Sequence, residues 1–409
     1  MIVFTWAIVA TSIAGVIFRP FGVKEFWPAL AGAAALVCFG LLPPRAALAG
    51  VAQGTDVYLF LTGMMILAEL AVSEGFFDWL AACTGRLAAG SARKLFFLIF
   101  VMAVLVTVFL SNDATAVVFT PAVAAMARTV KAQNPLPFLL ICAFVANAAS
   151  FVLPISNPAN LVVYGAHLPA LGAWVARYGL ASAGAIVATF LVLRVTQRGA
   201  LRQRIEAGAQ KISLSPGGRR AGLAIAAAAL VLMAASAAGL SLGAPTFFVA
   251  VAGMVFVLAP ARQAPWAMLG ALSWSVLPLV AGLFVMVAAL DRTGVALGLA
   301  NWLRHAGPAS YWGAGIGLAL VTNLVNNLPA GLLAGHALAQ SPGADAVTRA
   351  VLIGVDLGPN LSVTGSLATI LWLTALRRAG IAISAWTFLR LGALVMPPAL
   401  ALALAGGLW

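Results

Sequence analysis

The sequence predicts an all-α polytopic membrane protein, built as two inverted repeats of five transmembrane helices, each with a re-entrant hairpin and a broken helix. Three observations predict this fold. Apolar residues make up 63% of the 409 residues and charged residues only 8%, whereas soluble domains have about 45–50% and about 25%. Apolar runs reach about 20 residues, the length of a helix that spans a bilayer. The two halves also carry similar motifs in the same order, such as VFLSNDATAV and NLVNNLPAGL.

The first apolar segment covers residues 2–18, and the first basic residues, Arg19 and Lys24, follow it. A cleavable signal peptide carries its positive charge in front. We therefore expect a retained first helix with the N-terminus outside. Further uninterrupted spans are expected near residues 26–43, 57–75, 172–194, 221–241, 246–260, 273–290 and 384–406.

Four other regions are apolar but interrupted by polar residues and prolines. Two of them are expected to enter and leave on one side as re-entrant hairpins: residues 94–128, with a polar tip at 111–113, and residues 309–340, with a polar tip at 326–327. The other two are expected to be full but broken spans: residues 136–165 and 346–376, broken at 154–160 and 358–366. Interrupted helices in corresponding positions of two repeats indicate the binding site of a transporter.

The distribution of charge predicts the orientation. The chain carries 23 Lys and Arg against 10 Asp and Glu, and the model of five crossings per half puts most of the basic residues on the cytoplasmic side, as the positive-inside rule requires. We predict an N-terminal repeat at 1–195, a cytoplasmic connector at 196–220 and a C-terminal inverted repeat at 221–409. Both termini would lie outside a bacterial-type inner (cell) membrane. The excess of base is therefore assigned to cytoplasmic loops and not to nucleic-acid binding.

Two acidic residues lie at the interruptions near mid-membrane, Asp113 and Asp356. An ionisable group at that depth is expensive and is a functional candidate by default. Asp356 precedes a break, where it would face a negative helix end, and burial disfavours its charged form, which is the behaviour of a proton carrier. Asp113 is the second predicted proton-coupling residue, with helix capping as its alternative role. Asn147 is the neutral counterpart of Asp356 in the first half.

Uncharged polar residues gather at the same four interruptions. Backbone that is not helical at membrane depth persists only where it faces protein or a wet cavity. Four such clusters in symmetric positions predict a cavity lined by amides and hydroxyls, without Lys or Arg, that suits a neutral hydroxylated solute or a small cation. The predicted substrate-binding residues are Ser111, Asn112, Thr115, Ser156, Asn157, Asn326, Asn327, Thr364 and Ser366.

Several enzyme classes are disfavoured. The chain has no phosphate-binding Walker loop and no HExxH metalloprotease motif, so we expect neither an enzyme nor a cofactor. The three cysteines, Cys38, Cys83 and Cys142, are too scattered for a disulfide framework or a metal site.

The motifs at the interruptions resemble those of the arsenical-pump membrane proteins of the ion-transporter superfamily. The matching stretches are SNDATAVVFTPAV at 111–123, ISNPANLVV at 155–163, NNLPAGLLAG at 326–335 and DLGPNLSVTGSLATILWL at 356–373. The resemblance covers both halves and nearly the whole length. The chain departs from the family at Asn360, where the family often has Lys.

This resemblance implies export of arsenite and antimonite in exchange for protons, by a fold with scaffold and transport subregions. It also implies a soluble ATPase partner in some members, and folds of this kind are usually homodimers within the lipid bilayer. Arsenite is an uncharged trihydroxide at neutral pH, and Asn, Ser and Thr side chains supply matching donors and acceptors. Two alternatives stay open: a sodium-coupled carboxylate or sodium–proton exchanger of the same fold, and a passive channel for neutral hydroxylated solutes.

Overall fold

The computed structural model describes residues 1–207, 213–305, 308–340 and 345–409, and this part of the chain consists of helices joined by turns and short irregular segments. Its only β pairing is an isolated bridge between Ser91 and Arg204. The expected all-α class is confirmed.

The elements of the first half follow one another as the interrupted apolar pattern requires. They are α1 (Ile2–Phe18), α2 (Phe26–Cys38), α3 (Pro44–Gln53), α4 (Thr55–Ser73), α5 (Phe76–Ala88), α6 (Ala92–Phe109), the π-helical segment η2 (Ala114–Phe119), α7 (Thr120–Thr129), α8 (Leu136–Ala148), the 3₁₀ turn η3 (Pro154–Ser156), α9 (Pro158–Tyr164) and α10 (Leu171–Thr196).

The second half has the same kind of order after the connector. It consists of α11 (Pro216–Ala237), α12 (Gly243–Leu258), α13 (Trp266–Ala271), α14 (Val276–Asp291), α15 (Val295–His305), α16 (Pro308–Val325), α17 (Asn327–Ala339), α18 (Asp345–Leu357), the 3₁₀ turn η7 (Gly358–Asn360), α19 (Leu367–Arg378) and α20 (Ala385–Gly406).

Within the described ranges, six helices are long and apolar enough to cross a membrane: α4, α6, α10, α11, α12 and α20. The pair α14 and α15 makes a seventh if its 73° bend lies within one span. The other apolar helices have 10–17 residues, so the ten crossings stay a prediction. The expected span at 26–43 is too long, because α2 ends at Cys38. Gly40 then turns the chain with a φ of 67°, and Pro43 and Pro44 cannot continue that helix.

The helices break at the expected places. Helix α8 stops before η3 and α9, and α18 stops before η7 and α19. Both α8 and α18 have 13 residues, so Asn147 and Asp356 each occupy the next-to-last position. This correspondence supports the repeat, whose inverted orientation and re-entrant hairpins stay predictions.

Side chains at the breaks satisfy backbone groups that the helices leave open. Asn157 Oδ1 accepts from Ala159 N (3.0 Å) to begin α9, and Ser366 Oγ accepts from Thr369 N (3.1 Å) to begin α19. Asn326 Oδ1 accepts from Leu328 N at the start of α17 (3.4 Å). Such caps stabilise helix starts, and they are required wherever water cannot reach the backbone.

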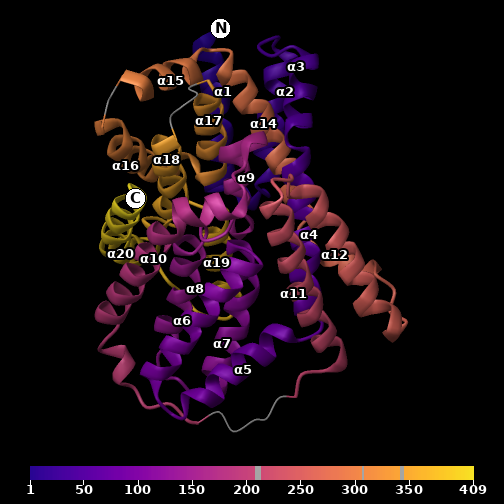
Figure 1. Cartoon of the computed structure of the whole chain (residues 1–409), viewed down its shortest axis with the longest axis vertical. Helices are drawn as coiled ribbons and strands as arrows, with labels where there is room; N and C mark the ends of the chain where they lie inside the picture. The colour runs from indigo at the N-terminus through magenta and orange to yellow at the C-terminus, as the bar shows by residue number, and fades with distance from the viewer. Residues whose placement is uncertain (208–212, 306–307, 341–344) are drawn as a thin grey trace.

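The two halves are packed into one another (Figure 1). Helix α4 lies against α12, and α14 lies against α2 and α3, whereas α10 packs on α20 and α9 on α17. The close approach of α4 and α12 requires a glycine, because a Cβ at Gly63 would lie 2.6 Å from Thr246 O. Each side of the molecule therefore contains helices of both halves, although the boundaries at 195 and 220 stay a prediction.

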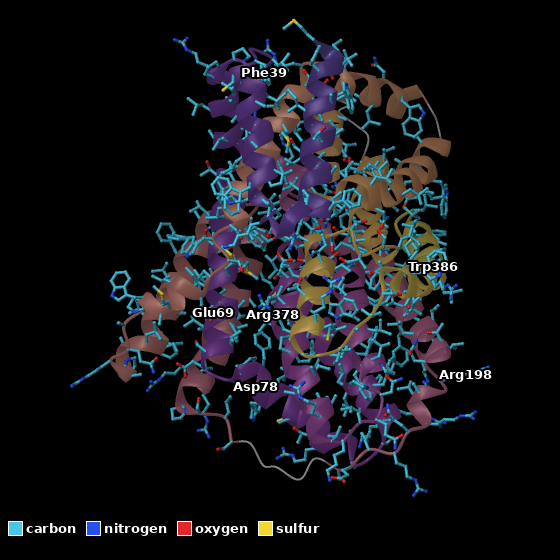
Figure 2. All side chains as sticks on the ribbon, turned by 180° about the vertical axis from the view of Figure 1, so that it is seen from behind. Phe39, Glu69, Asp78, Arg198, Arg378 and Trp386 are labelled. Carbon is cyan, nitrogen blue, oxygen red and sulfur yellow. The ribbon has the colours of Figure 1, made fainter. Side chains whose placement is uncertain are left out.

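The start of the connector contacts the segment that follows the first predicted hairpin. Lys131 forms an ion pair with Glu206 (2.8 Å), and Asn134 and Gln203 exchange two hydrogen bonds. Figure 2 shows Arg198 and Asp78 toward this end of the molecule, with Phe39 at the opposite end.

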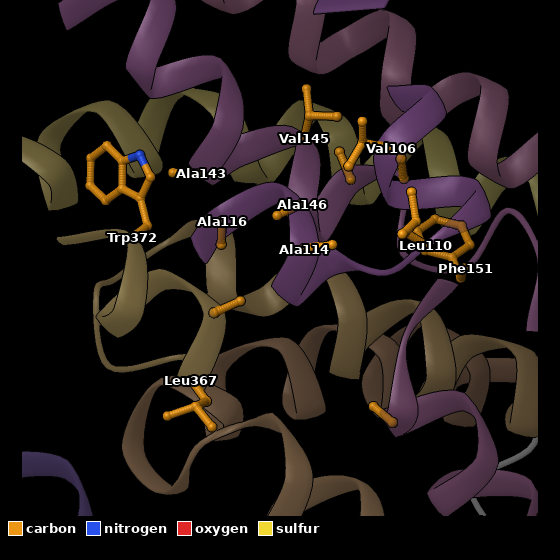
Figure 3. Close-up of a cluster of buried hydrophobic side chains, with 14 of the residues drawn as sticks. Val106, Leu110, Ala114, Ala116, Ala143, Val145, Ala146, Phe151, Leu367 and Trp372 are labelled. Carbon is orange, nitrogen blue, oxygen red and sulfur yellow. The ribbon is translucent and has the colours of Figure 1, made fainter. Parts of the chain in front are cut away.

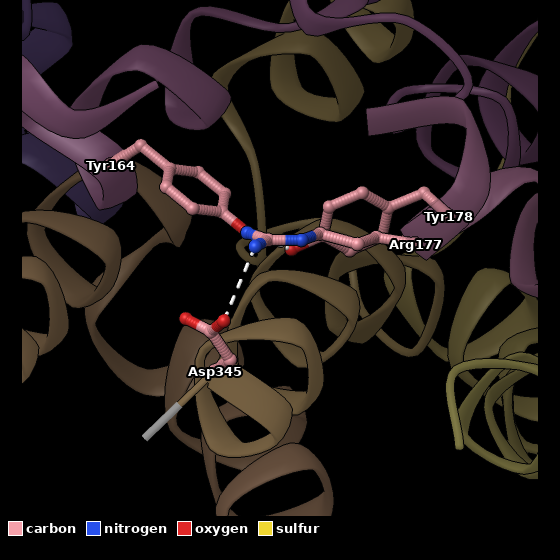
Figure 4. Close-up of polar contacts among 4 residues, drawn as sticks. All are labelled: Tyr164, Arg177, Tyr178 and Asp345. Carbon is pink, nitrogen blue, oxygen red and sulfur yellow. Dashed lines mark hydrogen bonds and ion pairs between the residues drawn. The ribbon is translucent and has the colours of Figure 1, made fainter. Parts of the chain in front are cut away.

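An ion pair on the surface links the first half to the start of α18 (Figure 4). Arg177 of α10 reaches the Asp345 carboxylate at 3.2 Å, and the hydroxyls of Tyr164 and Tyr178 share a hydrogen bond of 2.7 Å beside it. The Asp345 side chain is 76% exposed, and exposed ion pairs contribute only about 0–1 kcal/mol. The pair therefore adds little to the stability of the fold.

Candidate functional site

A fully buried carboxyl group lies where the two broken spans meet. Asp356, in the last turn of α18, is 0% exposed. Its Oδ2 accepts from Ser150 Oγ (2.7 Å) and its Oδ1 from Asn157 Nδ2 (2.8 Å). Both donors come from the break between α8 and α9. The break in one half thus supplies the hydrogen bonds that a buried carboxylate of the other half requires.

Asn147, the counterpart of Asp356, makes the reciprocal contact. Its Nδ2 donates to Asn360 Oδ1 (3.0 Å) and lies 3.5 Å from Thr369 Oγ1, both in the second half. Asn360 in turn donates to Phe144 O (3.1 Å). Asn360 is therefore a neutral and fully buried link between the two broken spans.

An apolar core fixes the parts that surround these polar contacts (Figure 3). Val106 and Leu110 pack near Val145 of α8, and Trp372 of α19 lies beside α8. The indole Nε1 of Trp372 donates to Leu139 O (2.9 Å). Because tightly packed cores do not deform continuously, the polar groups at the breaks are held in fixed positions.

A cavity of about 110 Å³ lies between α4, the tip of the first predicted hairpin and the starts of α9 and α19. Most of its lining is apolar. Its acidic residues are Glu69 of α4 and Asp113, with Ser111 beside Asp113, and its lining contains no Lys, Arg or His. The π-helical segment η2 begins directly after Asp113, and π-helical turns are frequent at functional sites.

The capping role considered for Asp113 is wrong. Its side chain makes no cap hydrogen bond. Instead, Asn112 Oδ1 accepts from Asp113 N (2.9 Å), and Ser111 Oγ accepts from Ala114 N (3.2 Å). The Asp113 carboxylate, half-buried at the cavity, has no hydrogen-bond or ion-pair partner among the described residues. It is therefore available to a solute or a proton.

Of the predicted substrate-binding residues, only Ser111 lines this cavity. Pro158 and Leu367, which also line it, follow directly after Asn157 and Ser366. The other hydroxyls and amides bond to groups of the same or a neighbouring interruption. Their contacts are Thr115 with Thr107 (2.7 Å), Ser156 with Val108 O (3.0 Å), Asn326 with Thr364 O (3.3 Å), Thr364 with Asn323 O (2.8 Å) and the main chain of Asn327 with Gly365 O (2.9 Å).

Sequence reasoning assigned no role to two residues of the site, Glu69 and Ser150. Asn160 Nδ2 donates to three main-chain carbonyls of the first break, among them Ser150 O (2.9 Å). Glu69 lies within an otherwise uninterrupted apolar span, and that alone marks it as a functional candidate. Ser150 carried no such signal, because a serine beside a helix end is common.

Helices of both halves that break around a buried carboxyl, beside an acidic cavity, are characteristic of a secondary transporter. Residues 8–355 match the model of the citrate transporter family (CitMHS), and the chain belongs to this family. It is a membrane transporter and not an enzyme.

Curated relatives refine this assignment. An arsenical pump membrane protein of Escherichia coli K12 is 27% identical over 423 residues, which cover 98% of this chain and 96% of the relative. A protein of the same name from Yersinia enterocolitica is 28% identical over 361 residues, covering 84% and 83% of the two chains. The resemblance to arsenical-pump proteins is thereby confirmed. The bacterial relatives and the apolar helices identify a multi-pass protein of the bacterial inner membrane.

A solved structure shows the same fold. The YdaH transporter of Alcanivorax borkumensis superimposes with a TM-score of 0.59 over 89% of this chain and 87% of its own, at 16% identity. The likeness concerns the fold alone.

Proposed function

We propose that the protein exports arsenite or antimonite from the cytoplasm in exchange for protons. The observation that carries this proposal is the cavity lined by Glu69 and Asp113 without any basic side chain. Two like unit charges 4 Å apart repel by about 4 kcal/mol at an effective dielectric constant of about 20. A citrate or dicarboxylate anion would therefore be repelled, whereas the uncharged trihydroxide of arsenic would not.

The hydrogen-bonding groups fit the same solute. Arsenite hydroxyls both donate and accept, and the Asp113 carboxylate and the Ser111 hydroxyl supply acceptors and a donor. We retain the nine predicted polar residues as the proposed substrate site, with Ser111 in direct contact and the others shaping the breaks. Asp113 and Asp356 are the proposed proton-coupling residues.

The proposed orientation has the connector in the cytoplasm and both termini outside. Homodimer formation and docking of a soluble ATPase subunit stay separate proposals.

Transport in everted membrane vesicles tests the function. Arsenite should accumulate in the vesicles against its gradient when a proton gradient is imposed, and an uncoupler should abolish the accumulation. Removal of sodium and addition of excess citrate should leave the rate unchanged. Accumulation that requires sodium, or that citrate inhibits, would instead indicate a sodium-coupled carboxylate exchanger. Flux that only dissipates a gradient would indicate a passive channel.

Thiols are not expected to take part in transport, although trivalent arsenic binds them. Cys38, Cys83 and Cys142 are all absent from the cavity lining, and Cys142 is fully buried within α8. A thiolate would bind arsenite so tightly that its release would limit transport, so we expect the transport path to use no thiol. A variant with all three cysteines replaced by Ala or Ser should therefore confer arsenite resistance within about twofold of the wild type. Growth in a sensitive host, normalised to the amount of protein in the membrane, measures this. Complete loss of resistance in a well-expressed variant would place a thiol in the site.

A further inference from the structure

The hydroxyl of Ser150 lies between two acceptors. Its oxygen is 2.8 Å from Asn147 O, at the end of α8, and 2.7 Å from Asp356 Oδ2. A hydroxyl has one hydrogen and can also accept, so Ser150 donates to only one of these oxygens at a time. Ser150 is 0% exposed, and both distances are within the range of good O–H···O bonds.

Each protonation state of Asp356 has a complete set of hydrogen bonds in this geometry. When Asp356 is charged, Ser150 and Asn157 donate to its two oxygens, and Asn147 O still accepts from Ser150 N (3.3 Å). When Asp356 is neutral, its own O–H donates to Ser150 Oγ, Ser150 donates to Asn147 O, and Asn157 still donates to Oδ1. The change requires rotation of one hydroxyl and no movement of the backbone.

We propose that Ser150 is the positioning residue that lets Asp356 gain and lose its proton while fully buried, by reversing the direction of their shared hydrogen bond. The proposal rests on the proton-coupled function given above. The proton on Asp356 comes from water and returns to water, whereas Ser150 keeps its own hydrogen and only turns it. Without this hydroxyl, the neutral acid would hold a buried O–H without an acceptor, which is costly.

The contacts of Asp356 leave Ser150 as the one group that suits both states. Asn157 Nδ2 can only donate. No charged side chain of the described residues contacts Asp356, and the titratable neighbour that interacts with it electrostatically is Tyr178 of α10. The phenol of Tyr178 is engaged with Tyr164 (2.7 Å), so it is not an alternative partner for the carboxyl group.

The same hydroxyl connects the carboxyl group to both breaks. Its second acceptor, the main chain of Asn147, belongs to the residue whose side chain reaches Asn360 and Thr369. Thr369 shares a hydrogen bond with Ser366 (2.9 Å), the cap of α19, directly before Leu367 of the cavity lining. A continuous chain of hydrogen bonds therefore runs from Asp356 of α18 to the start of α19.

Transport by purified, full-length protein in lipid vesicles tests the proposal. Ser150→Ala should lower proton-driven uphill arsenite transport about ten- to hundredfold, the size expected for a hydrogen bond to a charged group. Arsenite–arsenite exchange, which moves no net proton, should persist. Ser150→Thr, which keeps the hydroxyl, should restore at least half of the uphill rate. Ser182→Ala is the matched control, a buried serine of α10 whose hydroxyl has no partner among the described residues.

An infrared measurement of the same variants does not depend on the solute. At acidic pH the C=O stretching band of the neutral acid, identified by its loss in Asp356→Asn, should shift to higher frequency in Ser150→Ala and not in Ser182→Ala. An unshifted band, or wild-type uphill transport by Ser150→Ala, would overturn the proposal. Equal losses in Ser150→Ala and Ser150→Thr would do so as well, by showing that the site responds to packing. Failure of the wild-type protein to transport arsenite would refute the proposed function. The infrared measurement would still test the role of Ser150, because it does not depend on the solute.

Discussion

Asp356→Asn should abolish proton-driven uphill export of arsenite while leaving arsenite–arsenite exchange in place. An amide at this position keeps the two existing contacts, because its oxygen accepts from Asn157 and one N–H of its NH₂ group donates to Ser150. The variant thus resembles the neutral state permanently, and a transporter that cannot alternate between charged and neutral forms cannot couple a proton gradient to the solute. We expect the free energy of unfolding to stay within about 1 kcal/mol of the wild type, since Ser150 and Asn157 both keep their hydrogen bonds to this side chain.

Counterflow and gradient-driven uptake in the same vesicles measure the two activities separately. Asp345→Asn is the control on the same helix, because its carboxylate lies on the surface and pairs only with Arg177 among the described residues. That variant should keep both activities. Uphill export by Asp356→Asn at the wild-type rate would transfer the coupling role to Asp113 or Glu69.

The interruptions of the fold could be predicted from the sequence because each one carries its own local signal. Asn and Ser are favoured residues at the N-cap of a helix, and Pro is favoured at its first position. Asn157 before Pro158 and Ser366 before an apolar run therefore indicate helix starts, and the structure begins α9 and α19 there. The matching positions of Asn147 and Asp356 also followed from motifs alone. Local chemistry was sufficient for these features.

The partners of the polar groups could not be predicted in the same way, because they depend on how the halves pack. Nothing local in the first half indicates that Ser150 and Asn157 hold Asp356, more than 190 residues away along the chain. Glu69 lies within the expected span at 57–75, and only the packing of α4 beside Asp113 brings it to the cavity. Asn112 and Ser111 accept the main-chain hydrogen bonds that were considered for Asp113, so the free carboxylate at the cavity emerged only from the structure.

That free carboxylate leads to the second large effect. Asp113→Asn should lower uphill export and arsenite–arsenite exchange together, each by about tenfold or more, because a charged acceptor contributes about 1.5–3 kcal/mol to a hydrogen bond with a solute hydroxyl. Asp113 is proposed both to bind the solute and to carry a proton, so its replacement affects both assays, whereas the Asp356 change affects only the proton.

Glu69→Gln provides the comparison within the same cavity. Glu69 is half-buried on α4 and lines the same cavity, and its replacement should reduce both activities by less than Asp113→Asn does. Figure 2 shows its position in the molecule. A direct measurement of arsenite binding to the purified variants separates affinity from movement, and Asp113→Asn should bind more weakly in proportion to its loss of exchange. If exchange by Asp113→Asn stayed at the wild-type rate while uphill export disappeared, Asp113 would act on protons alone. The solute would then have to be held by the other polar groups of the cavity lining, Ser111 and Glu69.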